Sequence, residues 1–119
     1  GIPALVTVEG INGVTQNGCT IFPQAIAQGS TFNPELVEEM SRAIGRESHV
    51  IGIRQLQCPV LDIARDLRWG RVEETFGEDP FLNGFRTWFA GRGCRGHAEA
   101  FRGTRYAYGR IELCLRAGR

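Results

Sequence analysis

Charged and aromatic side chains that could bind a polar ligand are concentrated in two short segments, residues 9–13 and residues 62–71. The first segment begins with Glu9, whose carboxylate can accept hydrogen bonds from hydroxyl groups. The second contains Arg68 and Arg71, which donate hydrogen bonds in a fixed fork, and Trp69, which offers a flat apolar face. This combination suits a ligand with hydroxyl groups around its rim and C–H groups on its faces, such as a sugar ring. Structural ion pairs between the arginines and nearby carboxylates are the alternative interpretation.

Both segments follow predicted β-strands. Residues 4–8 and 56–61 are short apolar runs typical of strands, and a helix is predicted between them over residues 34–51. The helix has Asn33 as its N-cap, Pro34 at its first position and apolar side chains at helical spacing. A strand–helix–strand order favours two parallel strands in an α/β fold. Because ligands bind at the carboxyl ends of parallel strands, we expect Glu9 and residues 62–71 to meet at one edge.

The chain has 119 residues, which is one small domain at most, and its two parts differ in composition. Residues 1–83 contain six arginines against eleven acidic residues, a net charge of −5. Residues 84–119 contain eight arginines against two acidic residues, a net charge of +6, and are rich in glycine and alanine. This second part shows no helix caps and only weak periodicity. We therefore expect an irregular tail over residues 84–119.

No metal centre and no cofactor are predicted. The nearest approach to a metal-ligand pattern is Cys94 with His97, which supplies two of the roughly four ligands that a zinc site needs. No apolar run approaches the roughly 20 residues of a transmembrane helix, so we expect no membrane span.

Several motifs resemble those of family 3 glycoside hydrolases, the β-glucosidase and β-xylosidase group. The most specific is the run over residues 59–82, PVLDIARDLRWGRVEETFGEDPFL. The opening GIPALV, the EGING of residues 9–13 and the NPELV of residues 33–37 match the same family in the same order. The resemblance covers residues 1–83.

The resemblance implies that residues 1–83 are a fragment of an N-terminal TIM-like (β/α) barrel, holding about its second and third strands. It implies a retaining, exo-acting enzyme that removes terminal β-D-glucosyl or β-xylosyl residues, with a β-linked oligosaccharide or glycoside as partner. The family's acidic residue that binds sugar hydroxyls falls on Glu9, and its sugar-binding arginine falls on Arg71. Arg68 and Trp69 complete the predicted substrate-binding set.

No catalytic residue is assigned, because the family's nucleophile and acid/base lie on later parts of its sequence pattern. Eighty-three residues cannot close a barrel of about 250 residues, so we expect little or no activity from this chain. A carbohydrate-binding remnant without catalysis is an alternative function. Two strands alone also leave open sheet edges, which predicts self-association.

Three explanations of the tail stay open. It could be out-of-frame translation of a G+C-rich coding sequence, or a divergent barrel segment. It could also bind nucleic acid through runs such as Gly91-Arg92-Gly93 and residues 103–106, which interleave arginine, glycine and aromatic residues. Short arginine–glycine runs arise easily by chance, so nucleic acid is not the favoured partner.

Overall fold

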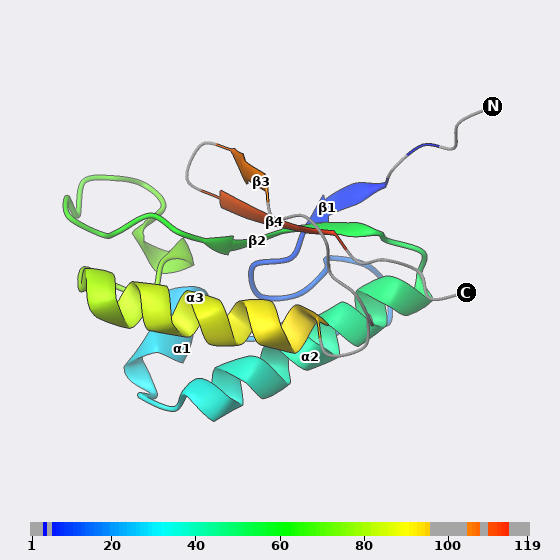
Figure 1. Ribbon diagram of the computed structural model, residues 1–119, viewed down its shortest axis with the longest axis horizontal. Helices are drawn as coiled ribbons and strands as arrows, with labels where there is room; N and C mark the ends of the chain where they lie inside the picture. The colour runs from blue at the N-terminus through cyan, green and yellow to red at the C-terminus, as the bar shows by residue number, and fades with distance from the viewer. Residues whose placement is uncertain (1–3, 5, 96–104, 108–109, 115–119) are drawn as a thin grey trace.

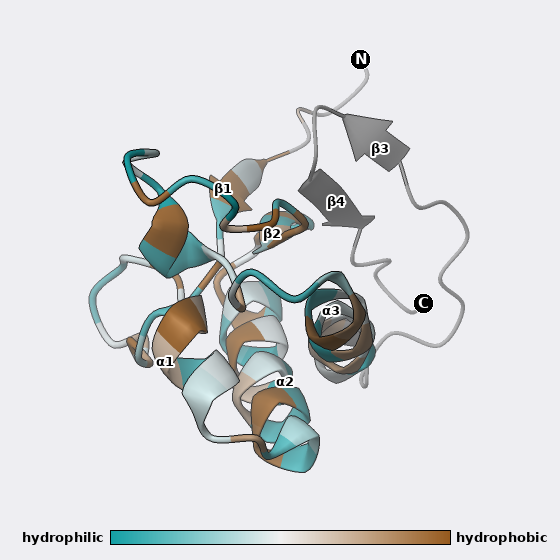
Figure 2. Ribbon diagram, turned by 90° about the vertical axis from the view of Figure 1, so that its left-hand side faces the viewer, coloured by the Kyte–Doolittle hydropathy of each residue, from teal (hydrophilic) through white to brown (hydrophobic). Residues whose placement is uncertain are grey.

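A computed structural model of the chain describes residue 4, residues 6–95, 105–107 and 110–114. Three helices lie on one side of a small sheet (Figures 1 and 2). The elements in chain order are β1 (Thr7–Glu9), α1 (Ala25–Ser30), α2 (Pro34–Val50), β2 (Gln55–Val60), the short 3₁₀ helix η1 (Val72–Glu74), α3 (Pro80–Arg95), β3 (Arg105–Ala107) and β4 (Arg110–Cys114).

The predicted strand–helix–strand unit is confirmed. β1 pairs in parallel with β2, with Val8 opposite Leu56 and Glu9 opposite Gln57. The strands lie within a few residues of their predicted positions, and the helix ends one residue before the predicted end. The two parallel strands and their helices form a small α/β unit. That this unit is a segment of a TIM-like (β/α) barrel stays a prediction.

Local signals account for the bounds of α2. The Asn33 side chain accepts a hydrogen bond from the Leu36 backbone N–H at 3.0 Å, and Pro34 occupies the first turn. Satisfying a free N–H in this way stabilises the start of a helix. At the other end Gly52 adopts a φ of 87°, a left-handed conformation that glycine accepts without strain.

The expectation of an irregular tail is wrong for residues 84–95, 105–107 and 110–114. α3 runs through Arg95, and β4 pairs antiparallel with β2 on the edge that β1 leaves open. Asp79 caps α3, because its carboxylate accepts hydrogen bonds from the backbone N–H groups of Phe81 at 2.7 Å and Leu82 at 3.1 Å. The sheet therefore has four strands, in the order β1-β2-β4-β3.

The core lies between the sheet and the helices, in two clusters of buried side chains. One joins β2 to α2 and α3, and the other joins α1, α2 and α3 to the loop before α3. The half-buried Phe22 packs against both. The first cluster consists of Val14, Ile44, Ile53, Leu56, Cys58 and Cys94, and the second of Ala25, Val37, Met40, Phe76 and Ala90.

Within the described segments, no helix is both long and apolar enough to cross a membrane. No group of three or more histidine, cysteine, aspartate or glutamate side chains in these segments could hold a metal ion. His97, the partner considered for Cys94, lies outside the described residues.

Candidate functional site

A hollow of about 290 Å³ opens where β1 ends and where the chain returns after β2. Glu9, the last residue of β1, lines this hollow together with Arg71, which directly precedes η1. More than sixty residues separate the two along the chain. Parallel pairing of β1 and β2 brings them together, because it places the carboxyl ends of both strands at one edge.

The Arg71 guanidinium is held by a carboxylate within the same turn. Its Nε donates to Glu74 Oε1 at 2.8 Å, and its Nη2 donates to Glu74 Oε2. The hydrogen bond with Glu74 raises the pKa of Arg71, and the charges of Glu9 and Asp62 act in the same direction. Arg71 therefore stays cationic and is held at the hollow that Glu9 also lines, with its side chain 40% exposed.

The loop after β1 is fixed by a second set of contacts. The Asn12 side-chain amide donates to the Phe22 carbonyl at 2.9 Å, and the Phe22 N–H donates to the Asn12 carbonyl at 2.7 Å. Between them Gly13 adopts a φ of 134°, where a side chain would collide with the Thr20 backbone. These contacts close a compact loop that holds one wall of the hollow in place.

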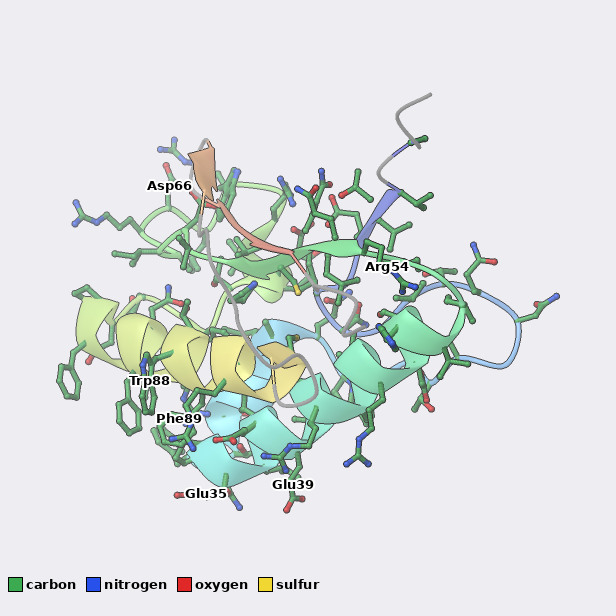
Figure 3. The ribbon with its side chains drawn as sticks, turned by 45° about the vertical axis from the view of Figure 1, so that its right-hand side comes forward. Glu35, Glu39, Arg54, Asp66, Trp88 and Phe89 are labelled. Carbon is green, nitrogen blue, oxygen red and sulfur yellow. The ribbon has the colours of Figure 1, made fainter. Side chains whose placement is uncertain are left out.

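The structure does not place Arg68 or Trp69 among the residues that line the hollow. Arg68 is 91% exposed and forms a two-point ion pair with Asp66, which lies on the loop after β2 (Figure 3). Its Nε lies 3.0 Å from Asp66 Oδ1 and its Nη2 lies 2.7 Å from Oδ2, and this pair lowers the pKa of Asp66. Trp69 is half-buried, and its backbone N–H donates to the Asp66 carbonyl at 3.0 Å. For Arg68, the structure shows the ion pair of the alternative interpretation.

Sequence reasoning missed three polar residues that line the hollow: Thr15, Gln24 and Glu74. Glu74 forms an ion pair with Arg71, of the kind that the alternative interpretation predicts for arginines and nearby carboxylates. Its spacing of three residues from Arg71 within one helical turn is the signal that could have placed it at the site. Thr15 and Gln24 lie in an irregular connection, and no local pattern marks them.

The run Gly91-Arg92-Gly93 lies in the described segments. Arg92 and Gly93 contact other residues of this chain. Arg92 Cζ lies 4.8 Å from the centroid of the Trp88 ring, and Arg92 Nε lies 3.6 Å from Glu38 Oε2. Gly93 is buried where α3 crosses α2. These contacts compete with the phosphate binding and base stacking that a nucleic-acid interface would need. Residues 103 and 104 lie outside the described part of the chain.

Comparison with known protein families settles the affiliation. Residues 1–88 match the family model of the glycosyl hydrolase family 3 N terminal domain. The chain belongs to glycosyl hydrolase family 3. A beta-xylosidase from Formosa agariphila is 40% identical over 88 residues, a match that covers 69% of this chain and 12% of that protein. A periplasmic beta-glucosidase from Salmonella typhimurium is 38% identical over 63 residues, covering 53% of this chain and 8% of the relative.

Solved structures of beta-glucosidases contain a similar fold. A beta-glucosidase involved in saponin metabolism from intestinal bacteria superposes with a TM-score of 0.78 at 40% identity, covering 83% of this chain and 13% of that one. A mutant beta-glucosidase from Listeria innocua in complex with laminaribiose gives a TM-score of 0.74 at 37% identity, covering 82% of this chain and 13% of that one. This family 3 chain thus spans about a tenth of the length of these relatives.

Proposed function

We propose that Glu9 and Arg71 bind the hydroxyl groups of one sugar ring in a family 3 glycosidase. The observation that carries the proposal is that a carboxylate and a guanidinium from distant parts of the chain line one hollow of about 290 Å³. Glu9 would accept hydrogen bonds from two neighbouring hydroxyl groups, and Arg71 would donate to a hydroxyl oxygen. The glucosidases and xylosidases among the relatives support a terminal β-glucosyl or β-xylosyl residue as the ligand.

In this proposal the chain supplies substrate binding, and the bond-breaking groups belong to other parts of the enzyme. A retaining glycosidase needs a nucleophilic carboxylate about 5–5.5 Å from a second carboxyl group that acts as acid and base. Glu74 also lines the hollow, but both of its carboxylate oxygens accept hydrogen bonds from Arg71. Glu74 therefore orients the arginine. Among the described residues that line the hollow, no second carboxylate remains to act with Glu9 as a nucleophile and acid/base pair. We expect sugar binding without turnover.

Sugar binding is tested by NMR titration of the ¹⁵N-labelled chain with methyl β-D-glucoside and methyl β-D-xyloside. A hydrogen bond to a charged group contributes about 1.5–3 kcal/mol, so Glu9→Gln and Arg71→Lys should each weaken binding about tenfold or more. Glu39→Gln, on the exposed face of α2, and Arg65→Lys, on the exposed loop after β2, are matched controls that should bind as the parent does (Figure 3 shows Glu39). If the site variants bind the sugars as tightly as the controls, Glu9 and Arg71 do not form a sugar site.

Catalysis is tested separately with chromogenic β-glucoside and β-xyloside substrates. We expect no hydrolysis above the buffer rate. Hydrolysis above the buffer rate in the parent chain and in both controls would contradict the binding-only role.

A further inference from the structure

The helix α3 carries its large aromatic side chains on the side that faces solvent. Phe81 is 81% exposed, Phe85 is 45% exposed and Trp88 is 52% exposed. The opposite side of the helix is buried and carries the charged side chain of Arg86, which is 1% exposed. Figure 3 shows Trp88 and Phe89 on the side of α3 away from the sheet. The usual amphipathic pattern, with apolar side chains inward and polar side chains outward, is therefore reversed in this helix.

These side chains form a continuous row of contacting rings, the aromatic row of α3, which consists of Phe81, Phe85, Trp88 and Phe89. The Phe81 and Phe85 ring centroids lie 6.3 Å apart, with an angle of 6° between the ring planes. The Phe89 centroid lies 4.9 Å from that of Phe85 and 5.1 Å from that of Trp88. The exposed rings present roughly 300–400 Å² of aromatic surface to solvent. An apolar patch of this size is typical of an interaction site.

We propose that the aromatic row of α3 is a self-association surface, on which a second copy of this chain packs its own α3 in antiparallel orientation. A two-fold dimer needs a surface that is complementary to itself. With Phe85 of each copy opposite Trp88 of the other, Gly84 lies opposite Phe89. A Cβ atom at Gly84 would meet nothing within 4 Å, so the row has an opening there that a facing ring can fill.

The charges at the two ends of α3 favour the antiparallel orientation. Glu78 and Asp79 are exposed and directly precede the helix, whereas Arg92 lies in its last turn with its side chain 49% exposed. In the same register Arg92 of each copy lies opposite Phe81 of the other, close to the two carboxylates. A guanidinium is attracted both to an aromatic ring and to acidic groups. A parallel pair would instead bring like charges together at each end.

The other candidate occupants fit the described surfaces less well. The strands at the open edges of the sheet, β1 and β3, have three residues each, and such short edges offer few backbone groups to a second chain. A saccharide would stack on flat ring faces. Arg92 Cζ lies 4.8 Å from the Trp88 centroid and covers one face of that ring, and Phe89 lies edge-on to Trp88. A second copy of α3 is therefore the occupant that the row favours.

The test is sedimentation equilibrium of the full chain at increasing concentration. The exposed aromatic surface is below the roughly 800 Å² per partner of stable complexes, so we expect a weak dimer. The average mass should rise from 13.2 kDa towards twice that value between about 10 µM and 1 mM. Gly84→Glu buries a carboxylate between the two rows and should weaken the dimer about tenfold or more. Gly70→Glu is the matched control, because Gly70 lies on the exposed loop after β2 and a Cβ there also meets nothing within 4 Å.

A second measurement, the ¹⁵N NMR spectrum at each concentration, locates the surface and checks the fold. Signals of residues 81–92 should shift as the concentration of the parent chain rises, and Gly84→Glu should keep the dilute parent's spectrum throughout. The proposal is overturned if the parent stays at 13.2 kDa, if Gly84→Glu associates as strongly as Gly70→Glu, or if the shifts lie in β1 or β3. It is also overturned if cellopentaose shifts the signals of residues 81–92 while the mass stays that of one chain, because the row would then bind a saccharide.

Discussion

The crossing of α2 and α3 gives the sharpest test of the fold, because a glycine lies at the contact. A Cβ atom added at Gly93 would lie 2.7 Å from the Ser41 Cβ and 2.9 Å from the Arg42 backbone N, and closer still to the Glu38 carbonyl oxygen. These atoms belong to the backbone and inner side chains of α2, so they cannot move aside without shifting the helix. Overpacking of this kind costs about 1–3 kcal/mol.

The Gly93→Ala substitution also brings a gain. Alanine is favoured over glycine in a helix interior by about 0.5–1 kcal/mol. Because the contact involves backbone atoms at less than 3 Å, we take the upper part of the overpacking range and expect a net loss of about 1–2 kcal/mol in the free energy of unfolding.

Gly84→Ala, in the same helix, is the matched control. A Cβ at Gly84 would meet nothing within 4 Å, so only the helix propensity changes and the chain should gain about 0.5–1 kcal/mol. Urea unfolding followed by circular dichroism measures both variants. If both alanines stabilise the protein equally, α3 does not pack on α2 as described, and the reasoning about this crossing is refuted.

Three further predictions follow from single contacts. Arg86→Met should stabilise the chain by about 1–2 kcal/mol in urea unfolding, because Arg86 is 1% exposed and its Nε has no hydrogen-bond partner in the described segments. Asn33→Ala should cost about 1 kcal/mol in the same assay, since it removes the cap of α2. Arg68→Gln should raise the pKa of Asp66, measured by ¹³C NMR of the carboxyl group, because Arg68 is what lowers it. An Asp66 pKa that does not move would show that the ion pair is absent in solution.

The Asp66–Arg68 ion pair makes the free energy of unfolding depend on pH in a defined direction. A carboxyl group with a depressed pKa in the folded state stabilises the fold at pH values above its unfolded pKa. That stabilisation is lost as the pH falls through the folded pKa. The Asp66→Asn variant should therefore show less acid-dependent change in stability than the parent, over the range below the ordinary aspartate pKa.

The strand–helix–strand unit could be predicted because its signals are local. Asn33, Pro34 and Gly52 mark the bounds of α2, and the helix buries an apolar stripe that repeats at helical spacing. α3 lacks such a stripe. Where a pattern search expects large apolar residues, its buried face carries polar or small ones: Asn83, Arg86, Thr87, Ala90 and Gly93. Tertiary contacts with α2 and α1 therefore hold this helix, and sequence periodicity does not reveal them.

For the hollow, topology alone predicted which two segments of the chain meet. Parallel strands place their carboxyl ends together, which is enough to expect Glu9 near the segment that contains Arg71. It is not enough to choose among the polar residues of the long connections. Thr15 and Gln24 reach the hollow only through the fold of the loop that Asn12 and Phe22 close. Such loop conformations depend on contacts between distant residues.

The two arginines of the RWGR run show why motif membership alone does not assign a side chain to a site. Arg68 and Arg71 are three residues apart, and each makes a two-point ion pair with a carboxylate close in sequence. Asp66 holds Arg68 on the exposed loop, where the side chain is 91% accessible, whereas Glu74 holds Arg71 at the hollow. The position of each acidic partner therefore decides which guanidinium lies at the hollow that Glu9 lines. Removing the carboxylate at position 74 should leave Arg71 charged, but its guanidinium would no longer be held at the hollow. Glu74→Gln is thus expected to weaken sugar binding although both Glu9 and Arg71 remain, and unchanged binding in that variant would show that Glu74 does not orient the arginine.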